Sequence, residues 1–226
     1  MSDKKPSVPE VEFSAKYDAD HAKAYFEKHR GGLARRLSDW RDHQIARKAL
    51  LMAGRPGSVL DMPCGTGRFW DLLTEEPERT IHACDYSQDM IDVGLKYRPP
   101  HMTGRIKAFQ GSAFALPVAD NFVDNIFCIR LIHHLGKKED RLRLLTELHR
   151  VTASTVIISL WVDGNVKAWR RQRLEAQRPR QSYQNRFVIA RDIIEQEFHQ
   201  SGFDVVGYLD FLPRYAMWRT YVLKKR

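Results

Sequence analysis

The chain has 226 residues, of which 43% are hydrophobic and 29% are charged, the balance of an ordinary globular protein. This length allows one domain with a sizeable core and is short for two. The sequence contains no apolar run of about 18 residues, so a transmembrane helix is not expected.

The charge balance is basic, with 37 Lys and Arg against 28 Asp and Glu and a net charge of +9. Such an excess favours anionic partners such as phosphates, nucleic acid or acidic lipid headgroups, so peripheral membrane contact stays open. Many basic enzymes nevertheless bind no polyanion. The three cysteines, at positions 64, 84 and 128, form no C-x-x-C pair, which predicts a reducing, cytoplasmic environment.

The N-terminal part divides into a polar leader and a long helix. Residues 1–12 are polar and contain two prolines, so they predict a disordered leader and no secretory signal. Residues 13–53 are expected to be helical, with Leu33, Leu37 and Trp40 on one stripe. The stripe continues at Ile45, Ala49 and Leu50.

Strand and helix patterns then alternate. Strands are expected at 58–62, 80–84, 105–109, 122–129 and 154–162. Helices are expected at 68–75, 88–97 (capped by Ser87) and 138–151. This order predicts an α/β fold with a parallel sheet covered on both faces. A helix at 191–201 and two successive strands at 203–211 and 216–224 predict a C-terminal hairpin.

A glycine-containing turn follows the first predicted strand, in the segment Asp61-Met62-Pro63-Cys64-Gly65-Thr66-Gly67. Glycines at such a turn let the backbone approach a ligand closely. A dinucleotide site needs a third glycine three residues after the second, where this chain has Trp70. That substitution disfavours a nicotinamide enzyme. Asp61 at the end of the strand suits a ligand with an ammonium group.

Two further polar positions follow the next predicted strands. Asp85 closes the second strand 18 residues after Gly67, a spacing that places a carboxylate within reach of a ribose diol. The alternative is that Asp85 only starts a turn. After the third strand, Ser112 and Ala113 of the segment Gln110-Gly111-Ser112-Ala113 are positioned to contact an adenine.

Four motifs occur in order: D-M-P-C-G-T-G, C-D-Y-S, G-S-A-x(2)-L-P-V-A-D-N-F-V-D and I-R-L-I-H-H-L. Together they resemble the class I methyltransferases of the UbiE-like, or methyltransferase 11, group, over about residues 57–160. The resemblance implies a Rossmann-like fold whose seven-stranded sheet has the order 3-2-1-4-5-7-6, with the last strand antiparallel. It also implies S-adenosyl-L-methionine (SAM) as cofactor and S-adenosyl-L-homocysteine as product.

The cofactor site that the resemblance implies spans the first four strand ends. Its residues are Asp61, Met62, Cys64, Gly65, Gly67, Arg68, Asp85, Tyr86, Met90, Ser112, Ala113 and Ile129. The family usually has an acid where Ser112 stands. No metal site is expected, because buried cysteine more often fills apolar space than binds zinc.

Catalytic candidates follow the fourth strand, where this fold would present the methyl group. They are Arg130, His133 and His134. A histidine there could act as a general base, whereas an imidazole packed into the core is the alternative. Arg130 could hold an anionic acceptor or pair with an acid.

Two segments outside the motifs could shape the acceptor side. Tyr17, His21 and Tyr25 lie on the N-terminal helix, which would be a lid over the cofactor or an ordinary packed helix. The substrate-side insertion 163–190 contains the basic stretch 167–186, with arginines at 170, 171, 173, 178 and 180 and the aromatic residues Trp169 and Tyr183. It would bind phosphates or form a solvated helix face.

These observations predict a SAM-dependent methyltransferase, with residues 13–226 as its single domain. The preferred acceptor is small or anionic, for example a phosphorylated sugar or a glycolipid intermediate. An RNA or protein methyltransferase and a non-catalytic SAM-binding interaction protein are the alternatives.

Overall fold

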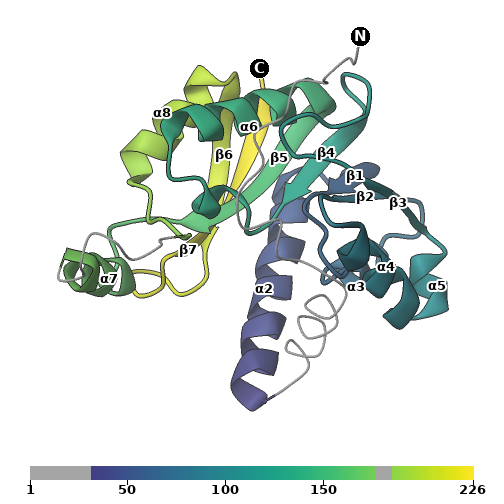
Figure 1. Cartoon of the computed structure of the whole chain (residues 1–226), viewed down its shortest axis with the longest axis horizontal. Helices are drawn as coiled ribbons and strands as arrows, with labels where there is room; N and C mark the ends of the chain where they lie inside the picture. The colour runs from purple at the N-terminus through teal and green to yellow at the C-terminus, as the bar shows by residue number, and fades with distance from the viewer. Residues whose placement is uncertain (1–31, 177–184) are drawn as a thin grey trace, which may run out of the picture.

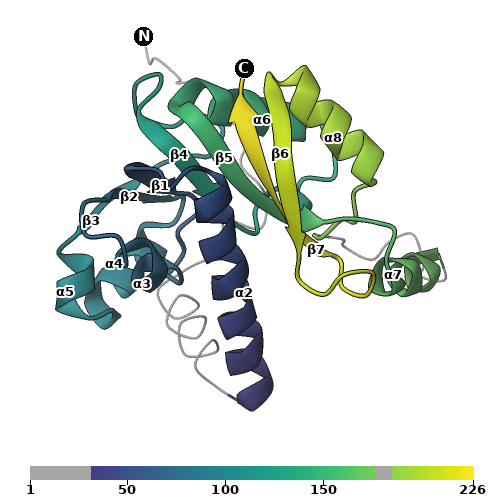
Figure 2. The ribbon, with the colours of Figure 1, turned by 180° about the vertical axis from the view of Figure 1, so that it is seen from behind.

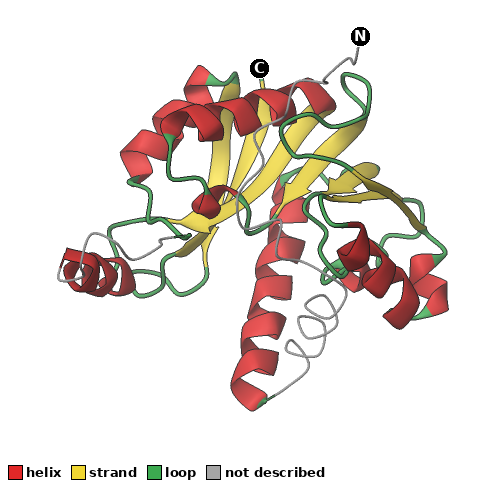
Figure 3. Cartoon of the chain, in the orientation of Figure 1, coloured by secondary structure: helices red, strands yellow, loops and turns green. Residues whose placement is uncertain are grey.

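The computed structural model describes residues 32–176 and 185–226 of the chain. Within them, a seven-stranded sheet has the order β3-β2-β1-β4-β5-β7-β6, and helices cover both of its faces (Figure 3). The first five strands pair in parallel, whereas β7 is antiparallel to both β5 and β6. The predicted fold class, strand order and C-terminal hairpin are therefore confirmed.

The elements lie close to their predicted positions. The strands are β1 (Ser58–Asp61), β2 (Thr80–Asp85), β3 (Ile106–Gln110), β4 (Val123–Cys128), β5 (Thr152–Trp161), β6 (Phe203–Asp210) and β7 (Trp218–Lys225). The α-helices are α2 (Leu33–Met52), α3 (Trp70–Leu73), α4 (Gln88–Tyr97), α5 (Pro100–Thr103), α6 (Lys138–Val151), α7 (Val166–Ala176) and α8 (Arg191–Gln200). None of the helices in the described part of the chain is long and apolar enough to cross a bilayer.

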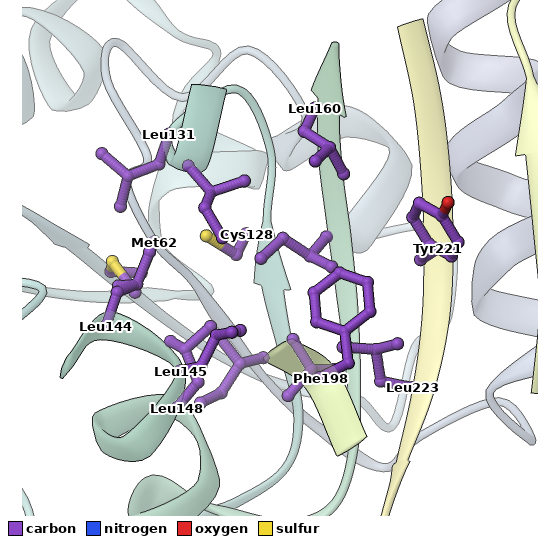
Figure 4. Close-up of a cluster of buried hydrophobic side chains, with 14 of the residues drawn as sticks. Met62, Cys128, Leu131, Leu144, Leu145, Leu148, Leu160, Phe198, Tyr221 and Leu223 are labelled. Carbon is purple, nitrogen blue, oxygen red and sulfur yellow. The ribbon is translucent and has the colours of Figure 1, made fainter. Parts of the chain in front are cut away.

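Successive side chains of the central strands point alternately into two separate apolar layers, one on each face of the sheet. In β4, Ile126 and Cys128 pack into the layer under α6 and α8, and Phe127 packs into the opposite layer. This period of two is expected for a strand that is buried on both faces. Figure 4 shows the first layer, in which Leu144 and Leu148 of α6 meet the strands. The same packing fixes the register of the sheet.

The opposite layer is built on the second half of α2 and on α3. Ala46, Ala49 and Leu50 pack there with Leu72 and with residues of the central strands. The first half of α2 differs from the expected apolar stripe, because Leu33 is 83% exposed and Trp40 is 56% exposed. Figures 1 and 2 show the reason: this half of the helix extends beyond the sheet.

Three local features complete the comparison with the sequence. The helices α5 and α7 were not predicted as separate elements. Thr152 both follows the last residue of α6 and begins β5, so the helix passes into the strand without an intervening loop. Tyr17, His21 and Tyr25, predicted on the N-terminal helix, lie outside the described residues, as do residues 178, 180 and 183 of the basic stretch.

Candidate functional site

The glycine turn lies at the carboxyl ends of β1 and β2, which pair in parallel as the sequence predicted. Gly65 and Gly67 have φ angles of 53° and 70°, both in the left-handed region that glycine adopts most easily. The backbone therefore turns sharply between β1 and α3. In sheets of this kind, ligands bind outside the carboxyl ends of the strands, which is where this turn lies.

Asp85 fixes the turn to the neighbouring strand. Its Oδ2 accepts a hydrogen bond of 2.8 Å from the Gly65 N–H, and its Oδ1 accepts one of 3.0 Å from the Ser87 N–H. Burial raises the pKa of Asp85, while the N–H groups of Ser87 and Gly65 act in the opposite direction. Each carboxylate oxygen still has a lone pair for a further donor. Asp85 thus both shapes the turn and offers acceptors to a ligand.

Asp61 is the second carboxylate of the site. It ends β1, is 2% exposed, and has an Oδ2 atom that lacks a hydrogen-bond partner among the described residues. Burial and the nearby charge of Asp85 raise the pKa of Asp61 well above its usual range, and the adjacent Trp70 side chain acts in the opposite direction. A buried acid without a full set of partners costs stability unless a ligand supplies the missing donor. The site therefore fits a cationic ligand.

Trp70 stands where a dinucleotide site has its third glycine, and its side chain packs against the glycine turn. It is fully buried, and a Cβ added to Gly67 would lie only 2.4 Å from its indole ring. A Cβ on Gly94 of α4 would lie 3.0 Å from the same indole. The indole therefore occupies the space between the turn and α4. In a dinucleotide fold, a third glycine brings helix and strand together at this point.

Other residues of the predicted cofactor set also surround the turn. The Met90 side chain would lie 3.6 Å from a Cβ on Gly65, and Ser87 caps α4 by accepting the Met90 N–H, as predicted. Cys64 is buried beside Trp70, and Met62 points into the layer under α6 (Figure 4). These two side chains pack in the core, so only their backbone is available to a ligand.

The remaining predicted cofactor residues lie along the same edge of the sheet. Tyr86 follows β2, and its carbonyl accepts a hydrogen bond from the Gln110 side chain. Ser112 and Ala113 follow β3 and are partly buried, and the Ser112 hydroxyl accepts the Phe114 N–H. Their direct role toward a ligand stays a prediction.

Two predicted arginines are joined through α2. Arg68 pairs with Asp39 at 2.7 Å and with Asp42 at 2.6 Å, and Arg130 pairs with the same Asp42 oxygen at 2.6 Å. Sequence reasoning missed both acids, although their i, i+3 spacing places them on one helix face. Asp42 therefore connects the glycine turn with the end of β4.

A hollow lies beside this ion-pair cluster, between α2 and the ends of β4, β5 and β7. Its lining residues are Asp42, Ile45, Ala46, Phe69, Ile129, Arg130, Ser159, Phe211, Trp218 and Thr220. Arg130 also lies over the Trp218 ring, 4.9 Å from its centroid. The hollow therefore offers an aromatic surface next to a guanidinium group, close to where the catalytic candidates were predicted.

His133 and His134 form a short helical turn after β4. His133 is 2% exposed and lies against Trp161 and Trp218, with centroid distances of 5.2 and 4.8 Å. Burial lowers the pKa of His133 to about 2 and that of His134 to about 4. Both imidazoles are therefore neutral at pH 7.

The three cysteines are buried in the described structure. Burial raises the pKa of each thiol, so the neutral form is favoured. Their side chains pack among apolar residues near the strand ends.

The strand order, the antiparallel β7 and the glycine turn together define the class I methyltransferase fold. The crystal structure of magnesium protoporphyrin IX methyltransferase from Synechocystis PCC 6803 with bound S-adenosylhomocysteine superposes with a TM-score of 0.76. It is 13% identical and covers 95% of this chain and 98% of its own. This likeness supports the fold alone.

Residues 59–155 match a methyltransferase domain family. The demethylmenaquinone methyltransferase of Geobacillus kaustophilus is 29% identical over 141 residues, 62% of this chain and 54% of that protein. A probable tRNA methyltransferase 9B of Mus musculus is 30% identical over 117 residues, 50% of this chain and 24% of that protein. The chain thus spans about half the length, or less, of these curated relatives.

Replacing Gly67 by Ala should disrupt the turn, because the new methyl group would collide with the Trp70 ring at a left-handed backbone position. We expect the free energy of unfolding to fall by about 3 kcal/mol. Gly65→Ala is the matched control, since its Cβ would meet only the Met90 methyl at ordinary contact distance, and it should cost about 1 kcal/mol. Urea denaturation measures both values, and equal losses would contradict the packing of Trp70 against Gly67.

The lowered histidine pKa values predict acid sensitivity. Below pH 6.5 the unfolded chain binds protons on His133 and His134 that the folded chain does not bind, so stability falls as the pH drops. His133→Phe should reduce the slope of unfolding free energy against pH by about 1 kcal/mol per pH unit between about pH 5.5 and 4.5.

Urea denaturation at several pH values gives this slope. His101→Gln, at an exposed position of α5, is the control and should leave the slope unchanged. A His133→Phe slope equal to that of the unsubstituted protein would show that His133 is not held neutral in the fold.

Proposed function

We propose that the protein transfers a methyl group from SAM to a small acceptor that carries an anionic group. Phosphorylated sugars and glycolipid intermediates are examples of such acceptors. The observation that carries the SAM assignment is the buried Asp61 beside the Gly65–Asp85 hydrogen bond. In this arrangement Asp61 has one carboxylate oxygen without a partner among the described residues. Asp85, on the other side of the glycine turn, is an acid that suits ribose hydroxyls.

Each part of SAM has a fitting group in this arrangement. Asp61 suits the ammonium group, which would supply the cationic partner that its Oδ2 atom lacks. Asp85 suits the ribose hydroxyls, with two oxygens that retain free lone pairs. Ser112 and Ala113 would contact the adenine. The proposed site therefore follows the carboxyl edge of β1, β2 and β3.

When bound, SAM would supply a methyl group on a sulfonium, to which an acceptor lone pair would form a bond while the C–S electrons pass to sulfur and S-adenosylhomocysteine leaves. The chain's contribution is to align the acceptor and exclude water. Ile129 and Arg130 at the end of β4 would place the acceptor in the hollow against Trp218. The ion pair with Asp42 holds the Arg130 guanidinium there.

The two histidines would act on the acceptor side. Their neutral imidazoles are in the form that accepts a proton, but low pKa values make them weak bases. Their contribution would be greatest for an acceptor that loses its proton easily. His133 has a buried Nδ1 atom that lacks a hydrogen-bond partner among the described residues, and neither histidine is among the residues that line the hollow.

An RNA acceptor is the second candidate. It is favoured by the net charge of +9 and by the likeness to the probable tRNA methyltransferase 9B. An RNA substrate predicts strongly salt-dependent binding, whereas a small acceptor does not. A protein acceptor and a non-catalytic SAM-binding role remain the other outcomes of the test.

The test is incubation of the purified protein with methyl-labelled SAM and a cell extract, followed by separation into small-molecule, lipid, RNA and protein fractions. We expect label in the small-molecule or lipid fraction, at least tenfold above that obtained with Asp61→Asn. Asp204→Asn on β6, an exposed acid remote from the turn, is the matched control and should label normally.

Label confined to RNA or to protein would overturn the proposed acceptor class. The absence of label from every fraction, with SAM binding intact, would overturn catalysis in favour of the binding role.

A further inference from the structure

The helix α7 carries three exposed apolar side chains on its outward side. Val166, Trp169 and Leu174 are 41%, 59% and 60% exposed. At about 100° per residue, Val166 lies between Trp169 and Leu174 around the helix. Ala168, which is 1% exposed, lies on the opposite side. Exposed apolar groups gathered in this way mark an interaction surface.

The inner side of α7 packs against the rest of the protein, so the residues on its outer side have defined positions. Arg171 lies over the Trp161 ring at 4.7 Å and donates a hydrogen bond of 3.2 Å to the Arg186 carbonyl. The Asn165 side chain accepts the Ala168 N–H and so caps the helix start. The buried side of α7 therefore fixes which residues point outward.

The loop between β6 and β7 extends this face. The backbone N–H groups of Val166 and Lys167 donate to the carbonyls of Arg214 and Tyr215, both at 3.0 Å. Leu212 and Tyr215 of the loop are 47% and 44% exposed. Figures 1 and 2 both place α7 beside this loop at one end of the molecule. We call this combined area the α7 surface.

Basic side chains alternate with the apolar ones across the α7 surface. Lys167, Arg170, Arg173 and Arg214 are all exposed. Residues 164–174 and 211–217 contain no acidic residue. Lys167 also lies over the Tyr215 ring, and Arg173 over the Trp169 ring, so charge and apolar area form one continuous surface.

We propose that the α7 surface docks the protein on an anionic lipid bilayer. The apolar side chains would enter the boundary between headgroups and acyl chains, and the basic ones would pair with lipid phosphates. RNA is the less suitable partner, because Val166, Leu174 and Leu212 offer it neither charge nor a stacking surface. This inference does not depend on the proposed methyl transfer.

The test is sedimentation of the purified full chain with vesicles of phosphatidylcholine, with or without phosphatidylglycerol. We expect binding to the anionic vesicles and little to the neutral ones. Trp169→Ser/Leu174→Ser and Arg170→Gln/Arg173→Gln should each weaken this binding roughly tenfold or more. Circular dichroism and urea denaturation verify that each variant is folded.

Matched controls remove similar groups elsewhere. Val206→Ser on β6 removes an exposed apolar side chain, and Lys48→Gln/Lys107→Gln removes two exposed cations; both should bind like the unsubstituted protein. Equal binding to neutral and anionic vesicles, no vesicle binding, or equal weakening by the controls would overturn the proposal. So would binding to an RNA hairpin that depends on the arginines while vesicles are not bound.

Discussion

The hydrogen bond from the Gly65 N–H to Asp85 is the interaction on which the site depends. It joins the turn after β1 to the end of β2 and so helps to fix the shape of the turn. The same acid accepts the Ser87 N–H at the start of α4. One carboxylate thereby fixes a strand end, a turn and a helix start, and the buried Asp61 lies at the other side of this arrangement.

Burying these two acids costs folding stability, and this cost points to a function for them. Asp61 and Asp85 both have raised pKa values because the fold removes them from water and, for Asp61, because the other acid is near. A fold selected only for stability would avoid two partly satisfied acids at one point. A ligand with one cationic group and several hydroxyl donors would satisfy both.

The acceptor side is connected to the cofactor side through α2. Asp42 accepts Arg68 from the glycine turn and Arg130 from the end of β4, and the hollow lies against this same group. A displacement of α2 would therefore affect both arginines together. This helix, and not the sheet alone, sets the position of the Arg130 guanidinium beside Trp218.

Much of the fold could be predicted from the sequence because apolar periodicity and turn residues determine it locally. The glycine turn, the Ser87 cap and the C-terminal hairpin all lie where the pattern places them. The pairing of Arg68 and Arg130 with Asp42 could not be predicted, since it joins residues far apart in the chain through the packing angle of α2. The exposure of Leu33, Leu37 and Trp40 was also missed, because periodicity shows that a helix has an apolar face but not whether the sheet reaches it. The environment of His133 depends on Trp218, which the hairpin brings back from the end of the chain.

The most direct test is calorimetric titration of the purified protein with S-adenosylhomocysteine, which needs no acceptor. The account predicts saturable binding that Asp85→Asn and Asp61→Asn each weaken by at least tenfold, while Glu78→Gln, an exposed acid next to β2, binds normally. Unsubstituted protein that gives no binding heat, or aspartate variants that bind as tightly as it does, would contradict the account.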